Sequence, residues 1–317
     1  MIDNSGTPDP SRASAKSRPG TCWVLALTFG VAVAPWSSAA AESGNPARDY
    51  VQQRKAEMLE RTLGKEAAAR LRVAPRIIGG KVAPAARWRS TVGLLFAMQR
   101  DNYEAHFCGG TLVDRRFVLT AAHCVDFLRP KDLQILAGTA SLAEGGTRFN
   151  VEKIIVHPMW DSRRFDFDIA LVKVTEPIKD VRLSRLIKRE EEVALVPRYT
   201  LSFVAGWGNT GPAPPEFPRE LHQVKVETQA RALCNRALSY RGNVTARMVC
   251  AGFPEGGKDA CSGDSGGPLT AKDESGAWRL QFGIVSWGIG CAEPNYFGVY
   301  TRLAVLSAWV EKMIARH

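Results

Sequence analysis

The stretch GDSGGPL, residues 263–269, decides how this chain is interpreted. A serine flanked by glycines can occupy a sharp turn on which backbone N–H groups converge on one point. Donors placed in this way stabilise negative charge that develops on an oxygen during a reaction. Ser265 is therefore a candidate nucleophile, and its hydroxyl needs a base to take its proton.

The sequence also contains a candidate base for Ser265 and a candidate partner for that base. His123, in TAAHC (residues 120–124), ends an apolar run beside a cysteine that a disulfide would fix. Asp168, in DIAL (residues 168–171), opens another apolar run, so its carboxylate could be shielded from water. Such a carboxylate holds the tautomer of an imidazole and balances its charge.

A rival interpretation has to be considered, because residues 263–267 also match the G-x-S-x-G nucleophile elbow of α/β-hydrolases. That fold places its histidine after the serine, and only His317, the last residue, lies there. The observed order is His123, Asp168, Ser265, which is the chymotrypsin order. The rival interpretation therefore fails.

The chain after Ile77 has the texture of a β protein. Short β-branched and aromatic runs alternate with turn residues, which predicts sandwiches or barrels rather than a parallel α/β sheet. The clearest runs are 91–98, 117–121, 133–137, 149–156, 169–174, 201–205, 221–227, 278–287 and 299–303. Only the tail, residues 304–316, has a clear helical pattern.

With these motifs in order, residues 77–317 resemble the trypsin family of serine proteases. The resemblance also rests on IIGG (77–80), CGGTL (108–112), SWG (286–288) and GVYT (298–301). It implies an all-β fold of two six-stranded antiparallel β-barrels with a C-terminal helix, and an active site in the cleft between the barrels.

The resemblance also implies roles for individual residues in peptide-bond hydrolysis. His123 would act as base and then as acid, Asp168 would orient it, and Ser265 would attack the carbonyl. The backbone N–H groups of Gly263 and Ser265 would form the oxyanion hole, and Ser286 would support Asp168. A non-catalytic homologue that acts as a binding protein is the alternative, which the presence of all three residues disfavours.

The resemblance places Asp259 at the floor of the pocket that receives the side chain before the cleaved bond. A carboxylate there suits arginine, whose planar guanidinium binds it through two hydrogen bonds. Ala260 replaces a serine of many relatives and removes an acceptor for lysine, so we expect arginine to be preferred. Tyr240 would support the pocket. The predicted substrate-binding set is Asp259, Ala260, Ser286, Trp287, Gly288 and Gly298.

The N-terminus predicts export. Three basic residues precede an apolar stretch, residues 22–34, and small residues follow at 37–41, as in a secretory signal peptide. We expect a signal peptide at residues 1–41 and a secreted protein, which would be periplasmic in a bacterium. The stretch is short for a bilayer span, and an uncleaved membrane anchor is the alternative.

Residues 42–76 form a predicted pro-segment, for which a partial stripe of Tyr50, Leu59, Leu63, Ala67 and Leu71 favours a helix over a flexible leader. It contains no cysteine, so no disulfide would hold it after cleavage. The resemblance implies activation at the Arg76–Ile77 bond, after which the new amino group of Ile77 would pair with Asp264.

Six cysteines follow the signal peptide, which is typical of a disulfide framework in an exported protein. Sequence alone leaves fifteen connectivities open, and grouping in neighbouring pairs favours 108–124, 234–250 and 261–291. The cysteines are Cys108, Cys124, Cys234, Cys250, Cys261 and Cys291.

The charge and composition of the chain give no sign of a nucleic-acid or membrane partner. The formal net charge is +10, but the charge forms no dense basic run, so we expect no nucleic-acid partner and no stable membrane span. Zinc-ligand spacing is missing, and Thr139 stands where calcium-binding relatives have a glutamate, so we expect neither metal nor cofactor. The expected partners are protein or peptide substrates with Arg or Lys before the cut, and protein protease inhibitors.

Overall fold

A computed structural model describes residues 44–65, 80–210 and 216–317 of the chain. The predicted signal peptide and the predicted activation bond between Arg76 and Ile77 lie outside these residues. All structural statements below concern the described part of the chain.

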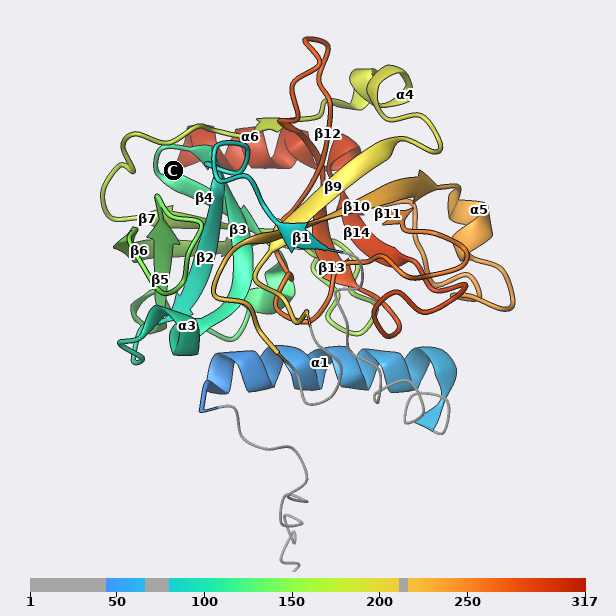
Figure 1. The fold of residues 1–317 in the computed structure, drawn as a ribbon, viewed down its shortest axis with the longest axis horizontal. Coiled ribbons are helices and arrows are strands. Elements are labelled where there is room, and N and C mark those ends of the chain that lie inside the picture. The colour runs from blue at the N-terminus through green and yellow to red at the C-terminus, as the bar shows by residue number, and fades with distance from the viewer. Residues whose placement is uncertain (1–43, 66–79, 211–215) are drawn as a thin grey trace, which may run out of the picture. The chain divides into compact units, whose positions relative to one another are not determined.

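The first barrel is closed, and its strands follow the order β2-β3-β4-β7-β6-β5 (Figure 1). All its pairings are antiparallel, as expected for short runs joined by turns. Most buried side chains of these strands are aliphatic and belong to one apolar cluster. The strands are β2 (Thr91–Phe96), β3 (His106–Asp114), β4 (Phe117–Thr120), β5 (Leu133–Ala137), β6 (Thr147–Val156) and β7 (Ala170–Val174).

The second barrel runs β10-β11-β14-β13-β12-β9 and is closed by the pairing of β9 with β10. The predicted pair of six-stranded antiparallel barrels is therefore confirmed. Two short strands extend this sheet, β1 (Lys81–Val82) beside β10 and β8 (Arg185–Leu186) parallel to β13. The barrel strands are β9 (Leu201–Gly206), β10 (His222–Gln229), β11 (Met248–Ala251), β12 (Pro268–Ala271), β13 (Leu280–Trp287) and β14 (Gly298–Arg302).

Helices are few in the described residues. The predicted C-terminal helix is confirmed as α6 (Ser307–Arg316), which buries Val310 on the barrels. Three single-turn helices lie in loops: α3 (Asn102–Ala105), α4 (Glu192–Leu195) and α5 (Arg231–Cys234). Among the helices of the described part, none combines the length and apolar character that a bilayer crossing needs.

The helix predicted in the pro-segment is present as α1 (Pro46–Leu63). Asn45 caps its start by accepting hydrogen bonds from the N–H groups of Ala47 and Arg48, and Gly64, at φ 86°, ends it. The buried face differs from the predicted stripe. Tyr50 and Leu63 are only half-buried, whereas Ala47, Arg48, Val51, Met58 and Leu59 are buried.

The disulfide pairing favoured by the sequence is confirmed, with bonds 108–124, 234–250 and 261–291. The first bond joins β3 to the short 3-10 turn η1 (Ala122–Cys124), which carries His123. The third bond joins the chain just before Ser265 to the loop after Trp287. Two of the three bonds therefore brace the chain beside the predicted catalytic residues.

The two barrels are joined by backbone and hydroxyl hydrogen bonds close to these residues. The N–H of Gly109 donates to the carbonyl oxygen of Ser265 at 2.7 Å, and the Thr301 hydroxyl donates to the carbonyl oxygen of Asp168 at 2.7 Å. Gly266 has φ 79° and lies so close to the first barrel that a Cβ would be 2.2 Å from Oγ1 of Thr120. The seam therefore requires glycine at this position.

We expect Gly266→Ala to lower the free energy of unfolding by at least about 2 kcal/mol, because the new methyl group would push the barrels apart. Gly276→Ala is the matched control, since Gly276 also has a positive φ (80°) but no neighbour within 4 Å of the added Cβ. Backbone strain alone should cost the control about 1 kcal/mol. Urea unfolding of both variants measures the difference, and equal losses would contradict a steric role of the seam.

Candidate active site

The structure brings His123 and Asp168 together in the first barrel. Nδ1 of His123 lies 2.7 Å from Oδ2 of Asp168, and the backbone N–H of His123 donates to Oδ1 at 2.9 Å. The Ser286 hydroxyl, from β13 of the second barrel, donates to the same carboxylate at 2.5 Å. Both side chains are completely buried. The carboxylate thus holds the imidazole ring from one side.

Ser265 lies on the sharp turn that its sequence predicted, with Gly263 at φ 99° before it and Gly266 after it. Its hydroxyl is buried and has no hydrogen-bond partner in the described structure, so the bond to His123 is not formed here. Neither the N–H of Gly263 nor that of Ser265 donates a hydrogen bond to another described residue. Two unused donors therefore remain beside the nucleophile, as an oxyanion hole requires.

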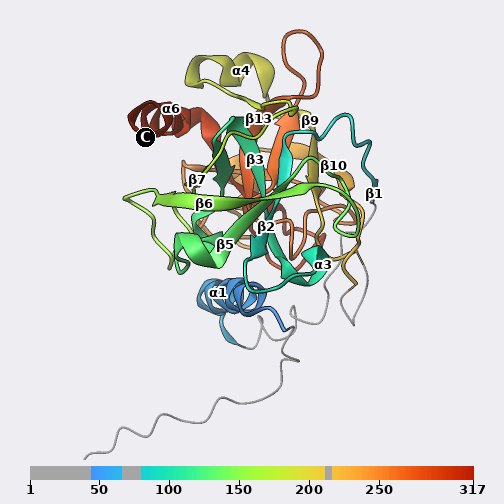
Figure 2. The ribbon, with the colours of Figure 1, turned by 90° about the vertical axis from the view of Figure 1, so that its left-hand side faces the viewer.

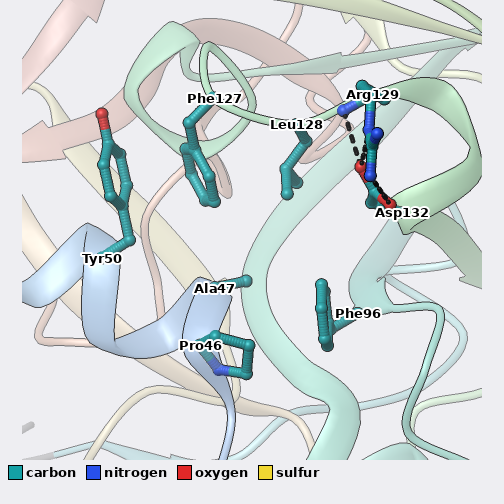
Figure 3. Close-up of a pocket in the computed structure, with 8 residues that line it drawn as sticks. All are labelled: Pro46, Ala47, Tyr50, Phe96, Phe127, Leu128, Arg129 and Asp132. Atoms are coloured by element: carbon teal, nitrogen blue, oxygen red, sulfur yellow. Dashed lines mark hydrogen bonds and ion pairs between the residues drawn. The ribbon is translucent and has the colours of Figure 1, made fainter.

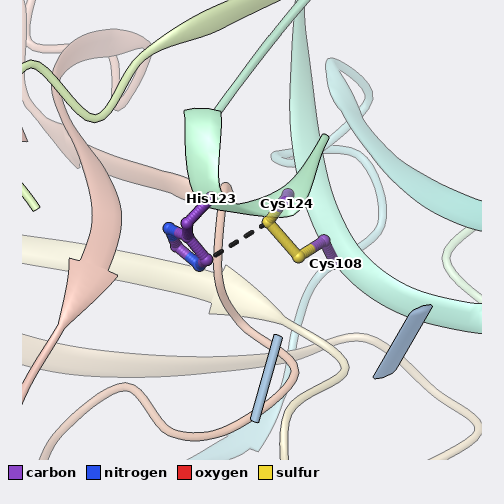
Figure 4. Close-up of side chains that lie close together, drawn as sticks. All are labelled: Cys108, His123 and Cys124. Carbon is purple, nitrogen blue, oxygen red and sulfur yellow. Dashed lines mark hydrogen bonds between the residues drawn. A yellow bond between two sulfur atoms is a disulfide. The ribbon is translucent and has the colours of Figure 1, made fainter. Parts of the chain in front are cut away.

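The other nitrogen of the imidazole faces sulfur. Nε2 of His123 lies 3.7 Å from Sγ of Cys124, close to Cys108 (Figure 4). These three side chains are near enough to hold a metal ion, but the two cysteines share a disulfide and offer no thiolate. This cluster is therefore a covalent brace for His123.

Asp259 lies in the second barrel with only 3% of its surface exposed. Its carboxylate accepts hydrogen bonds from the N–H groups of Ala260 (2.8 Å) and Ala292 (3.3 Å). Burial raises the pKa of Asp259 to about 7, because water no longer solvates the charge. Gly298 leaves the room that this carboxylate needs, since a Cβ there would be 2.5 Å from Oδ1.

The walls of the Asp259 pocket are braced by Tyr240. Its hydroxyl donates to the carbonyl oxygen of Phe297 and accepts from the N–H of Ile289 at 3.4 Å. Its ring packs edge-on against Trp287 with centroids 4.8 Å apart. A Cβ at Gly288 would approach no atom closer than 3.8 Å, so it would make only ordinary van der Waals contacts. Tyr240 and Trp287 therefore lie together beside Asp259, where the sequence predicts the substrate pocket.

Asp264 is buried beside Ser265 and is held by backbone donors. It accepts hydrogen bonds from the N–H groups of Gly208 (2.9 Å) and Cys261 (2.8 Å), while burial raises its pKa to about 6. A Cβ at Gly206 or at Gly208 would lie within 2.4 Å of the carboxylate oxygens. Sequence reasoning missed this two-glycine cradle, although both glycines flank the tryptophan of AGWG (residues 205–208).

Sequence reasoning also missed Lys55, which belongs to α1. The charges of Asp168, Asp264 and Asp259 act on its ammonium group and raise its pKa, but burial has the larger effect and lowers that pKa to about 8. Lys55 continues the spacing of Ala47 and Val51 on the buried face of the helix. A lysine in the middle of an apolar stripe was the signal available in the sequence.

The fold and the site together define the class. Two antiparallel barrels meet at a seam that carries a serine turn, a histidine and a buried aspartate, as in two-barrel serine proteases. Comparison with known proteins agrees with this class. A family model described as Trypsin matches residues 77–310, and the chain belongs to the trypsin family of serine proteases.

Individual relatives support the assignment. Trypsin 5G1 of Aedes aegypti is 38% identical over 243 residues, which cover 77% of this chain and 86% of that protein. Vitellin-degrading protease of Bombyx mori is 38% identical over 239 residues, covering 75% and 86%. Transmembrane protease serine 11G of Mus musculus is 34% identical over 265 residues, covering 83% and 61%.

The pKa of Asp259 predicts how a cationic pocket ligand binds. An aromatic amidine stays charged between pH 5 and pH 8 and needs the ionised carboxylate, so its affinity should fall below pH 7, where Asp259 takes up a proton. The fall should approach about tenfold per pH unit. Calorimetric dissociation constants for the protein cleaved after Arg76 measure this, and His123→Ala separates the effect from imidazole titration. If the affinity of the His123→Ala variant did not change with pH, Asp259 would not be the group that binds the amidine.

Proposed function

We propose that this chain is a secreted endopeptidase, made as an inactive precursor, that hydrolyses peptide bonds after arginine and, less readily, after lysine. The carrying observation is the buried carboxylate of Asp259, which has backbone N–H donors but no cationic side chain within 4.0 Å in the described structure. An arriving guanidinium would supply that cation through two hydrogen bonds. Proteins and peptides are the proposed substrates, and protein protease inhibitors are further partners.

In the proposed mechanism His123 takes the proton of Ser265 as its oxygen attacks the carbonyl carbon of the substrate. Asp168 keeps the ring in the tautomer whose Nε2 accepts that proton, and the Ser286 hydroxyl steadies the carboxylate. The N–H groups of Gly263 and Ser265 stabilise the oxyanion. His123 then protonates the leaving amine, and water releases the acyl group by the same steps in reverse.

Activation is proposed to follow cleavage of the Arg76–Ile77 bond, after removal of a signal peptide at residues 1–41 and with residues 42–76 as the pro-segment. The new Ile77 amino group would pair with Asp264, for which Gly206 and Gly208 leave room. A buried carboxylate without a cation is costly, so the amine has a physical reason to insert. Because Arg76 suits the proposed pocket, the enzyme can also cut its own precursor.

The arginine preference should appear as a higher kcat/KM for an arginyl substrate than for the lysyl substrate of otherwise identical sequence, by about tenfold. Ala260→Ser should narrow this ratio, because the added hydroxyl can accept a hydrogen bond from the lysine ammonium. Steady-state kinetics on the paired substrates measure both effects. Equal values in the unaltered enzyme would refute the preference.

Catalysis through Ser265 predicts rapid covalent labelling of the activated protein by a serine-directed fluorophosphonate. Ser265→Ala should remove the label and lower kcat by at least about a thousandfold. Arg76→Gln should leave the precursor unlabelled after treatment with an arginine-specific protease. Full activity of the uncut Arg76→Gln protein would contradict activation at this bond, and an unlabelled activated protein would favour a binding protein on a protease scaffold.

A further inference from the structure

Helix α1 runs along both barrels on the side of the active site. Figure 1 shows it running beneath the strands of both barrels, with its first turn nearest α3, and Figure 2 shows it end-on. Its buried residues belong to the same apolar clusters as residues of the site: Val51 packs in the cluster of Cys124, and Met58 in that of Trp287. Ser265 and His123 have no exposed surface in this structure.

The N-terminal end of α1 is anchored on the first barrel by polar contacts. The Asn45 amide donates to the carbonyl oxygens of Glu104 (2.8 Å) and Ala105 (2.9 Å). The Arg48 guanidinium donates twice to the carbonyl oxygen of His106, at 2.6 and 3.1 Å. These four bonds satisfy buried groups and therefore fix the position of the helix along the cleft.

The next turn makes looser contacts. The Tyr50 ring packs on Phe127, with centroids 3.8 Å apart, and next to this contact a hollow separates the helix from the barrel (Figure 3). The hollow is lined by Pro46, Ala47, Tyr50, Phe96, Phe127, Leu128, Arg129 and Asp132. Because packing around this hollow is incomplete, the other contacts of α1 attach it to the barrels. These are the hydrogen bonds of Asn45 and Arg48 and the apolar contacts of Val51, Met58 and Leu59.

The C-terminal half of α1 packs on the walls of the substrate pocket. Met58 and Leu59, 3% and 7% exposed, share one apolar cluster with Tyr240, Trp287 and Phe165. Tyr240 and Trp287 are the residues that lie together beside Asp259. The helix therefore packs on side chains that lie next to the proposed pocket.

Lys55 lies between these two anchors, where the helix passes the carboxylates of the site. Its ammonium is close enough to Asp168, Asp264 and Asp259 for all three charges to act on it. In turn, the Lys55 charge lowers the pKa of Asp259 and of Asp264, opposing the effect of burial. Lys55 thus brings a positive charge near Asp259 and Asp264 without forming an ion pair within 4.0 Å with a described carboxylate.

The helical backbone explains why Lys55 would block the site without being cut. In an α-helix the carbonyl oxygen of residue i accepts a hydrogen bond from the N–H of residue i+4, so the Lys55 carbonyl is engaged by Leu59. It cannot at the same time take the N–H groups of Gly263 and Ser265. The Lys55 charge therefore acts on Asp259 while the peptide bond beside Lys55 stays unavailable for attack.

We propose that residues 44–65 are an inhibitory segment that binds across the active-site cleft with Lys55 in place of the substrate's basic side chain, and that the free segment competes with substrates of the activated enzyme. This inference rests on the proposed function, because it assigns an occupant to the same cleft. The segment has no cysteine, so non-covalent contacts alone hold it after cleavage. Its inhibition is therefore reversible by dilution.

The test uses a peptide of residues 44–65, acetylated and amidated at its ends, added to the enzyme activated after Arg76. It should inhibit hydrolysis of a small arginyl substrate competitively, raising KM and leaving kcat unchanged. Lys55→Ala in the peptide should raise Ki by about tenfold or more. Lys65→Ala is the matched control, because Lys65 is exposed at the end of the segment, and its Ki should stay within about twofold.

Further measurements keep the outcomes separate. Circular dichroism checks that the two alanine peptides are equally helical, and fluorescence anisotropy with a Ser265→Ala enzyme measures binding without cleavage. Turnover of the arginyl substrate without peptide tests the proposed function by itself. In an active enzyme, absence of inhibition, equal effects of Lys55→Ala and Lys65→Ala, or rapid cleavage after Lys55 would overturn the inference.

Discussion

Three buried carboxylates, those of Asp168, Asp259 and Asp264, impose the constraint on which the rest of this structure depends. A carboxylate removed from water destabilises the fold unless hydrogen bonds or a cation compensate it. Each of the three accepts backbone N–H groups from a tight turn, and Asp168 also has the His123 ring and the Ser286 hydroxyl. The surrounding turns must therefore hold their donors rigidly.

That rigidity accounts for much of the local sequence. The Cys261–Cys291 disulfide ties together two segments that supply donors, the N–H of Cys261 to Asp264 and that of Ala292 to Asp259. Glycines stand where a Cβ would collide with a carboxylate, at Gly206 and Gly208 around Asp264 and at Gly298 beside Asp259. The chemistry of the site and the stability of the second barrel are therefore supported by the same turns.

These dependencies explain what the sequence could predict. Short apolar runs between turn residues, such as 133–137, predicted the ends of most strands to within one or two residues. The spacing of the cysteines suggested the disulfides. β3, β11 and β12 were missed: β3 contains two consecutive glycines, and β11 and β12 have only four residues each. Gly206, Gly208 and Lys55 act through neighbours distant in sequence, which only the folded chain brings close. The buried face of α1 was misjudged because Lys55 interrupts its apolar pattern.

The same constraint links activation and inhibition in the proposed scheme. In the precursor the Lys55 charge acts on both Asp259 and Asp264 and offsets part of the effect of burial on each. After cleavage the Ile77 amino group would compensate Asp264, and an arriving arginine would compensate Asp259. Each of these two cations would approach its own carboxylate more closely than Lys55, which acts on two carboxylates at once, can approach either. Replacing one shared cation by two dedicated ones strengthens both interactions, since the attraction between charges grows as they approach. The exchange therefore favours release of the helix once cleavage has occurred.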